Sequence, residues 1–363
     1  MSKKGENIYK RKDGRWEARY IKGYRPDGKT YYGYAYGKTY REAKNKCQAA
    51  KTSIIQKSPP VSLNSRFSFY CDNWLSLISL KVKYSTTVKY YSIVENHIKP
   101  FLGGMSPHNI TTNIVEAFTR KLLYEKKLSP KTTKDILIVL RSILKHTNNL
   151  PAVDIYYPKQ QPKEMRVLTK EEQFRLVSYL STDMDIFKFG TLLALLTGMR
   201  IGEICALKWE NISFKDKTIK ISSTVQRLKS SEENNKKTKL NISNPKSHTS
   251  FRIIPITDHI ADICKKFYND SPENFVVSGK SVPLDPRTLQ YRFRGYINYL
   301  GFKDVHFHTL RHTFATRCVE VGFEIKSLSE ILGHSSPKIT LERYVHSSLE
   351  LKRDNMNKLL MFG

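Results

Sequence analysis

Four patches in the second half of the chain carry polar residues suited to chemistry on a phosphate ester. They read T-G-M-R-I-G-E-I from Thr197, P-K-S-H-T-S-F-R-I-I-P-I from Pro245, H-T-L-R-H-T-F-A-T from His308, and L-G-H-S-S-P-K-I-T-L-E-R-Y up to Tyr344. Attack on phosphorus needs a nucleophile, a way for it to lose its proton, a donor for the leaving oxygen and cations for the developing charge. The patches contain residue types for each of these needs.

Two arginines, Arg200 and Arg311, lie inside otherwise apolar stretches, where a cation needs an anionic partner. The planar guanidinium binds two phosphate oxygens at once and stays charged, which lysine cannot reproduce. Taken alone, either arginine is more commonly a surface or salt-bridge residue. Glu203, three residues after Arg200, is predicted to hold that arginine or a neighbouring histidine, and its alternative role is a structural helix pair.

Histidines accompany both arginines. His308 and Arg311 are three residues apart and share one face of a helix, so they can meet one phosphate together. A neutral His308 could accept the nucleophile's proton or bond a phosphoryl oxygen, and the spacing leaves both roles open. His306 and His312 are rivals by proximity, but His312 points about 100° away from Arg311 on a helix and is predicted to be a packing residue.

The nucleophile is predicted to be Tyr344, one of 21 tyrosines, because it follows the cationic patches. A phenol with a pKa near 10 is a poor nucleophile unless cations stabilise its anion. Attack would give a 3′-phosphotyrosyl link and a free 5′ hydroxyl. Since the link retains the bond energy, rejoining is expected to need no cofactor, neither ATP nor a metal, and Asp183 and Asp185 are an unsupported alternative metal site.

Together, in this order, the four patches resemble the tyrosine recombinase family over about Val167 to Tyr344. The resemblance implies that Lys246 is the general acid that protonates the leaving 5′ oxygen, and that His334 bonds the scissile phosphate. Neighbouring lysines make a solvated charge run the alternative for Lys246, whereas its spacing to Arg252 and Pro255 favours the catalytic role. Gly333 and Ser336-Pro337 around His334 also suit a turn between two helices.

The composition predicts a polyanionic partner. Lys and Arg total 62 against 33 Asp and Glu, a net charge of +29, and nucleic acid is the leading candidate. A membrane is disfavoured because the charges spread along the chain and no apolar run is long enough to span a bilayer. Five dispersed cysteines without a C-x-x-C pair predict reduced core residues in a cytosolic protein.

The sequence predicts a multidomain α+β protein. Aromatic runs between Asn7 and Gly37, broken by D-G and R-P-D-G, predict a three-stranded sheet with one apolar and one cationic face, followed by a helix over Tyr40 to Lys57. Such a sheet could enter a major groove, or its aromatics could serve only as the core of a small domain. Residues 1–57 resemble the arm-binding domain of integrases from phages and conjugative transposons.

Proline-containing linkers near 58–65 and 150–165 separate two further predicted domains. Residues 66–150 predict an all-α, four-helix core-binding domain, each helix opened by a Ser or Thr cap. Residues 167–363 predict a mixed, mainly α catalytic domain with a small antiparallel sheet. It is expected to begin with a capping box from Thr169 to Glu172, to contain an extended hairpin or loop over Ser230 to Ser243, and to end in an amphipathic helix.

We therefore expect an integrase-type recombinase that cuts and rejoins double-stranded DNA at core and arm-type sites in the bacterial cytosol. The resemblance implies a dimer to tetramer on DNA and a DNA-bending or directionality accessory protein. It also implies a C-terminal helix that docks on a neighbouring protomer, with packing on its own domain as the alternative. One alternative is a strand-relaxing enzyme like a type IB topoisomerase, which would not need the appended β-rich domain. Another is a DNA-binding regulator, which would not need a particular tyrosine.

Overall fold

The computed structural model describes residues 7–24, 30–57, 66–147, 152–161, 165–229, 238–243, 251–344 and 356–357. The chain divides into two compact units, residues 1–160 and 161–363. The first unit contains both segments predicted to be separate DNA-binding domains, so their division remains a prediction. Among the described residues, no helix is both long and apolar enough to cross a bilayer.

The described chain opens with the predicted antiparallel sheet and helix: β1 (Ile8–Lys10), β2 (Trp16–Tyr24), β3 (Thr30–Gly37) and α1 (Tyr40–Lys57). A buried cluster joins one face of the sheet to α1 through Ala18 and Ala43, and Trp16 packs on it. Tyr34 and Tyr36 are exposed on the other face, which also carries Arg19. The aromatic residues therefore serve both the core and the cationic face.

The predicted all-α segment contains four main helices: α2 (Phe67–Ser79), α3 (Tyr84–Ile93), α5 (Thr112–Arg120) and α6 (Pro130–His146). Helix α3 continues through a π-helical turn (Val94–Ile98) into α4 (Lys99–Leu102), and α5 continues into a second such turn (Lys121–Glu125). Their apolar faces share one core. Residues 153–157 of the predicted linker pack on this core through alternate side chains, Val153, Ile155 and Tyr157.

The predicted side-chain caps are correct only for α6, where the Ser129 hydroxyl accepts a hydrogen bond from the main-chain N–H of Thr132. Helices α2, α3 and α5 have no side-chain cap. At α2 a nearby loop replaces the cap, because the N–H groups of Phe67 and Ser68 donate to main-chain carbonyls after α4. At α2, main-chain carbonyls from a distant part of the chain thus accept the helix-start hydrogen bonds for which we predicted a Ser or Thr side chain.

The second unit is mixed and mainly helical, as predicted. Its helices are α7 (Lys170–Ser181), α8 (Ile186–Thr197), α9 (Ile201–Ala206), α10 (Asp258–Phe267), α11 (Pro286–Tyr299), α12 (Phe307–Glu320), α13 (Ile325–Leu332) and α14 (Pro337–Tyr344). A small antiparallel sheet has the order β4-β5-β8, with β4 (Ile212–Ser213), β5 (Thr218–Ile221) and β8 (Arg252–Pro255). The expected capping box is present at the start of α7.

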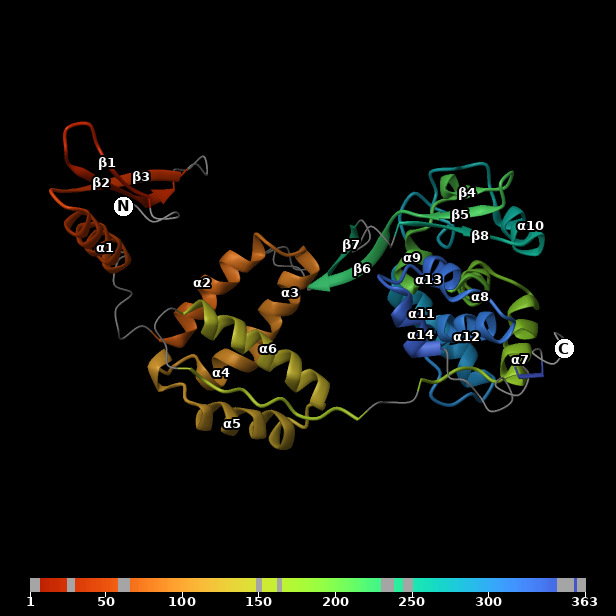
Figure 1. Cartoon of the computed structure of the whole chain (residues 1–363). Coiled ribbons are helices and arrows are strands. Elements are labelled where there is room, and N and C mark those ends of the chain that lie inside the picture. The colour runs from red at the N-terminus through yellow and green to blue at the C-terminus, as the bar shows by residue number, and fades with distance from the viewer. Residues whose placement is uncertain are drawn as a thin grey trace. The chain divides into compact units, whose positions relative to one another are not determined.

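Residues 238–243 of the predicted extended segment form β7 (Thr238–Ser243), which pairs with the preceding β6 (Thr224–Lys229) and projects with it from the body of this unit (Figure 1). Residues 230–237 and most of the predicted C-terminal helix lie outside the described residues.

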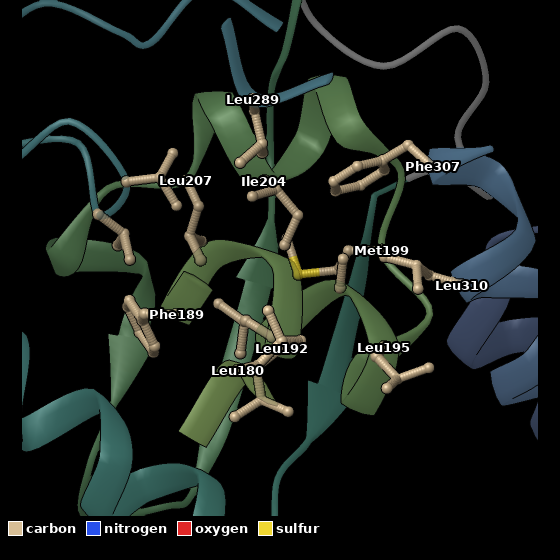
Figure 2. Close-up of a cluster of buried hydrophobic side chains, with 14 of the residues drawn as sticks. Leu180, Phe189, Leu192, Leu195, Met199, Ile204, Leu207, Leu289, Phe307 and Leu310 are labelled. Atoms are coloured by element: carbon tan, nitrogen blue, oxygen red, sulfur yellow. The ribbon is translucent and has the colours of Figure 1, made fainter. Parts of the chain in front are cut away.

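One apolar core holds the elements that carry the first three sequence patches, whereas Leu332 and Tyr344 of the fourth belong to a separate buried cluster. Met199 and Ile204, on either side of Arg200, point into the same cluster as Phe307 and Leu310 of α12 (Figure 2). All four side chains are at most 4% exposed. Because interiors are close-packed, this contact fixes the backbone of Arg200 against the helix that carries Arg311.

Replacing Gly198 by Ala tests how tightly this region is packed. Gly198 ends α8 with φ +66°, and an added Cβ would lie 2.5 Å from Cδ1 of Phe314. We expect the left-handed backbone to cost about 1 kcal/mol and the overlap about 1–3 kcal/mol more. Gly301 is the matched control, because it has φ +73° but open space around its Cβ direction. Equal losses of unfolding free energy in urea would contradict this packing.

Candidate active site

The first part of the site is the turn between α8 and α9. Gly198 adopts the left-handed conformation that ends α8, and the chain then turns so that Arg200 becomes the N-terminal cap residue of α9. The main-chain N–H of Arg200 donates to one carboxylate oxygen of Glu203 at 2.8 Å, and its guanidinium donates to the other at 2.8 Å. The predicted pair of Arg200 and Glu203 is therefore formed.

Glu203 also binds a second arginine that the sequence reasoning did not assign to the site. The guanidinium of Arg252, on β8, donates to both oxygens of Glu203, at 3.1 and 2.8 Å. Burial raises the pKa of Glu203, but the hydrogen bonds from Arg252 and the charges of both arginines outweigh it and lower the pKa to about 2. Glu203 therefore stays ionised between two cations.

A signal for Arg252 was present in the strand pattern. In β8, Arg252 alternates in phase with the buried Ile254, whereas Ile253 is exposed. A charged residue in the inward phase of a strand needs a buried partner of opposite charge. That pattern could have directed attention to Glu203 as the partner.

Arg311 lies deeper, with only 2% of its surface exposed. Its guanidinium donates to two main-chain carbonyls, those of Gly198 at 2.8 Å and Leu332 at 2.6 Å. Burial, followed by the nearby charge of Arg200, lowers the pKa of Arg311 to about 9. The charged form is thus destabilised at this position, and an anion bound beside it would restore that loss.

The three arginines converge on the C-terminal end of α13. Besides the bond of Arg311 to Leu332, the guanidinium of Arg252 donates to the carbonyl of Ile331 at 2.5 Å, and that of Arg200 to the carbonyl of Gly333 at 3.4 Å. Carbonyls at the end of a helix lack partners within the helix and carry its partial negative charge. The site therefore holds its cations with helix-end dipoles and with Glu203.

Tyr344 is the last residue of α14, and 5% of its surface is exposed. Its ring stacks on that of His334, with centroids 6.2 Å apart and planes 4° apart. Its hydroxyl lies 2.9 Å from Nδ1 of His312. Burial raises the pKa of Tyr344 more than Arg311 and Arg343 lower it, so the phenol is protonated in this state.

The histidines of the site are neutral. Burial, and then the charge of Arg311, lowers the pKa of His308 to about 4 and that of His334 to about 3. The rings of His308 and His312 lie edge to face, 4.5 Å apart, and Nδ1 of His334 lies 2.8 Å from the hydroxyl of Thr340. The ring contact and the hydrogen bond hold the three histidine rings in place without adding charge to the site.

The prediction that His312 only packs was wrong, because its ring bonds the hydroxyl of Tyr344. That prediction used only the angle of about 100° that separates His312 from Arg311 around the axis of α12. The partner of His312, Tyr344, lies on α14. The spacing of residues within α12 does not predict which face of α12 packs against α14.

The structure thus brings together six of the seven predicted site residues: Arg200, Glu203, His308, Arg311, His334 and Tyr344. Lys246 lies outside the described residues. A groove of about 520 Å³ begins at Arg200 and His308 and runs along β6 to the first turns of α11, where Arg287 and Gln290 line it. The site can therefore hold an anion beside a hydroxyl nucleophile, with room for an extended substrate.

Within the described ranges, no group of three His, Cys, Asp or Glu residues could hold a metal ion. Asp185 instead caps α8 by accepting hydrogen bonds from the N–H groups of Phe187 and Lys188. All five cysteines are buried free thiols, as predicted.

Comparisons with known proteins agree with this arrangement. The tyrosine recombinase XerC-like protein of Caldanaerobacter subterraneus subsp. tengcongensis is 27% identical over 344 residues, which cover 86% of this chain and 87% of the relative. The ICEBs1 integrase of Bacillus subtilis is 25% identical over 325 residues and covers 84% of each chain.

Solved structures show the same fold. The Tn1549 transposon integrase in complex with transposon right end DNA aligns with a TM-score of 0.68 at 20% identity, covering 81% of this chain and 99% of that one. A lambda integrase tetramer bound to a Holliday junction aligns with a TM-score of 0.57 at 18% identity, covering 95% and 98%.

Two family models match the chain in the expected order. An N-terminal SAM-like domain of phage integrases matches residues 66–123, in the helical segment. The phage integrase family matches residues 166–350, just over half of the chain, and this range contains the arginines, histidines and tyrosine of the site. The chain belongs to the phage integrase family.

Proposed function

We propose that this chain is a site-specific DNA recombinase, which cuts and rejoins DNA strands through a 3′-phosphotyrosyl intermediate. The observation that carries the proposal is the hydroxyl of Tyr344, which is buried beside Arg311, bonded to His312 and adjacent to a groove that begins at Arg200. A binding module needs cations, but it does not need a phenol held among them.

In the cleavage step, the oxygen of Tyr344 forms a bond to phosphorus while the bond from phosphorus to the 5′ oxygen breaks. The phenol gives its proton to the neutral ring of His308, and the leaving 5′ oxygen gains one from Lys246. Arg200 and Arg311 bind the non-bridging oxygens and stabilise the charge that grows on them. Rejoining reverses these steps with the 5′ hydroxyl of another strand as nucleophile.

The resting electrostatics support this role. The guanidiniums of Arg200 and Arg252 share the carboxylate of Glu203, whereas that of Arg311 is held by the main-chain carbonyls of Gly198 and Leu332. A phosphodiester supplies the missing negative charge. His334 and the neutral His308 can then donate hydrogen bonds to the phosphate without adding repulsion to the arginines.

Two surfaces provide further contacts to duplex DNA. The groove along β6 carries Arg287 and Gln290 beside the site. The outer face of the N-terminal sheet carries exposed tyrosines with guanidiniums over their rings, for example Arg19 at 4.6 Å from the ring centre of Tyr32. We assign this sheet to a second, arm-type site, which favours a recombinase over a topoisomerase-like enzyme acting on one site.

Assembly on DNA is part of the proposal. The lambda integrase structures include a dimer bound to a core site and a tetramer bound to a Holliday junction. We infer that this chain also acts as a dimer to tetramer on DNA in the bacterial cytosol, with its C-terminal tail on a neighbouring copy. A DNA-bending or directionality protein would complete the assembly.

Replacing Tyr344 by Phe is the direct test of the nucleophile. On a nicked duplex whose cleavage releases a short 5′-hydroxyl strand that diffuses away, the wild-type chain should accumulate a covalent protein–DNA adduct. The phenylalanine variant should form none, because it lacks the attacking oxygen. The adduct is read by denaturing electrophoresis with labelled DNA.

Tyr291, which is 77% exposed on α11, provides a matched control. Tyr291→Phe should form adduct like the wild type. An adduct that persists in Tyr344→Phe would overturn the assignment of the nucleophile, and relaxation of supercoiled DNA that lacks a second site would favour the topoisomerase-like alternative.

Replacing Lys246 by Ala tests the general acid. Cleavage should slow by about 10²–10⁴-fold, because the 5′ alkoxide would leave without a proton. A substrate with sulfur in place of the bridging 5′ oxygen should restore the rate, since a thiol with a pKa near 8.5 leaves readily as its anion. Lys239→Ala, in β7, serves as the control. A variant equally slow on both substrates would show that Lys246 does not supply this proton.

Replacing Glu203 by Gln tests the carboxylate that holds two arginines. Loss of one member of a buried ion pair should lower the unfolding free energy by about 3–5 kcal/mol. Cleavage should also slow, because Arg200 loses the partner that orients it. Glu210→Gln is the control, since Glu210 pairs with Lys208 at 3.4 Å and is 52% exposed at its side chain. Similar losses for the two variants would contradict the central role of Glu203.

A further inference from the structure

The environment of the Tyr344 hydroxyl points to a residue outside the predicted set. Three contacts fix this side chain: its ring packs on a cluster that includes Cys318 and Leu332, it stacks on His334, and its hydroxyl meets Nδ1 of His312 at 2.9 Å. The first two hold the plane of the ring. Only the third acts on the oxygen that would attack phosphorus.

The direction of this hydrogen bond follows from the neighbours of the phenol. Arg311 lowers the pKa of Tyr344 and so lies close to its oxygen, and a guanidinium can only donate hydrogen bonds. Arg311 therefore cannot accept the hydrogen of the phenol, and we infer that this hydrogen is directed to His312. Nδ1 of His312 is then the acceptor, and the ring carries its hydrogen on Nε2.

We propose that His312 is a positioning residue for strand cleavage, which holds the hydroxyl hydrogen of Tyr344 on one side so that an oxygen lone pair faces the phosphate beside Arg311. This inference rests on the proposed function, because it assigns a role to the nucleophile of that reaction. A nucleophile must present electrons rather than a hydrogen to phosphorus, and a small displacement of its oxygen costs a large factor in rate.

Positioning fits the resting site better than proton transfer. Burial, and then His308, lowers the pKa of His312 to about 4, whereas burial raises that of Tyr344 above its ordinary value near 10. Arg311 and Arg343 both face His312, so a proton on its ring would be repelled. His312 therefore accepts a hydrogen bond and leaves the proton on the phenol until the phosphate arrives.

The ring of His312 is itself fixed by its neighbours. It lies edge to face with His308, whose ring centre is 4.5 Å away, and both rings stand on α12 one turn apart. Arg311 and His312 are adjacent on that helix and reach the same oxygen from two directions. The pair can therefore define the place of the hydroxyl more closely than either residue alone.

Substitution of His312 by Leu, Asn and Gln in the full chain provides the test. Leu removes the acceptor and should slow adduct formation on the nicked duplex by about 100-fold, a typical effect of misplaced reacting atoms. The amide oxygen of Asn reaches the place of Nδ1, so Asn should keep the rate within about tenfold of the wild type. Gln reaches the place of Nε2 instead and should resemble Leu.

DNA affinity and folding distinguish positioning from damage to the site. The dissociation constant for the nicked duplex should stay within about twofold in all three variants, because His312 donates nothing to the phosphate in this proposal. Cys318→Ala is the packing control: it removes a side chain from the same buried cluster as Tyr344 but leaves the hydroxyl bond in place. It should cleave at close to the wild-type rate.

Each result separates the two proposals. If the wild type forms no adduct, or Tyr344→Phe forms one, the proposed function fails before His312 is at issue. If the wild type reacts and His312→Leu reacts at the same rate, only the role of His312 is overturned. Asn as slow as Leu would also overturn positioning, since it would mean that His312 takes the proton, and a slow Cys318→Ala would assign the effect to packing.

Discussion

The site depends on an imbalance of buried charge, in which Arg200, Arg252 and Arg311 are gathered around the single carboxylate of Glu203. Like charges in a partly dry environment repel strongly, so they persist only where fixed dipoles and an anion oppose them. In the described part of the chain, the carbonyls at the ends of α8 and α13 supply the dipoles. We propose that the remaining demand for negative charge is met by the phosphodiester of the substrate.

The same contacts also hold the fold together. Carbonyls at helix ends have no partner within their own helix, and here guanidiniums from α12 and β8 satisfy several of them. The turn after α8, the end of α13 and strand β8 at the edge of the small sheet are thereby tied to one another. Met199 and Leu310 extend this link into the apolar core (Figure 2). Packing and phosphate binding therefore cannot be optimised separately in this unit.

The sequence predicted what is local and periodic. Turn residues and the alternation of apolar and charged residues predicted the N-terminal sheet, and the T-K-E-E run predicted the capping box of α7. Features that depend on distant partners were missed: α2 uses loop carbonyls in place of a cap, and Arg252 meets Glu203 from 49 residues away. His312 was missed because its partner belongs to another helix. Residue type and spacing thus identified the cations of the site, but not the contacts that orient them.

Tyr344 meets its stacking partner and its hydrogen-bond acceptor within one polypeptide. Tyr344 of a neighbouring copy could enter this active site only if it lost both contacts and the burial of its ring in its own copy. In the assembly that we propose on DNA, a defective member therefore remains defective, however many intact copies surround it. A cell that made both forms would lose more than the defective fraction of its activity, so such an allele would behave as a dominant inhibitor.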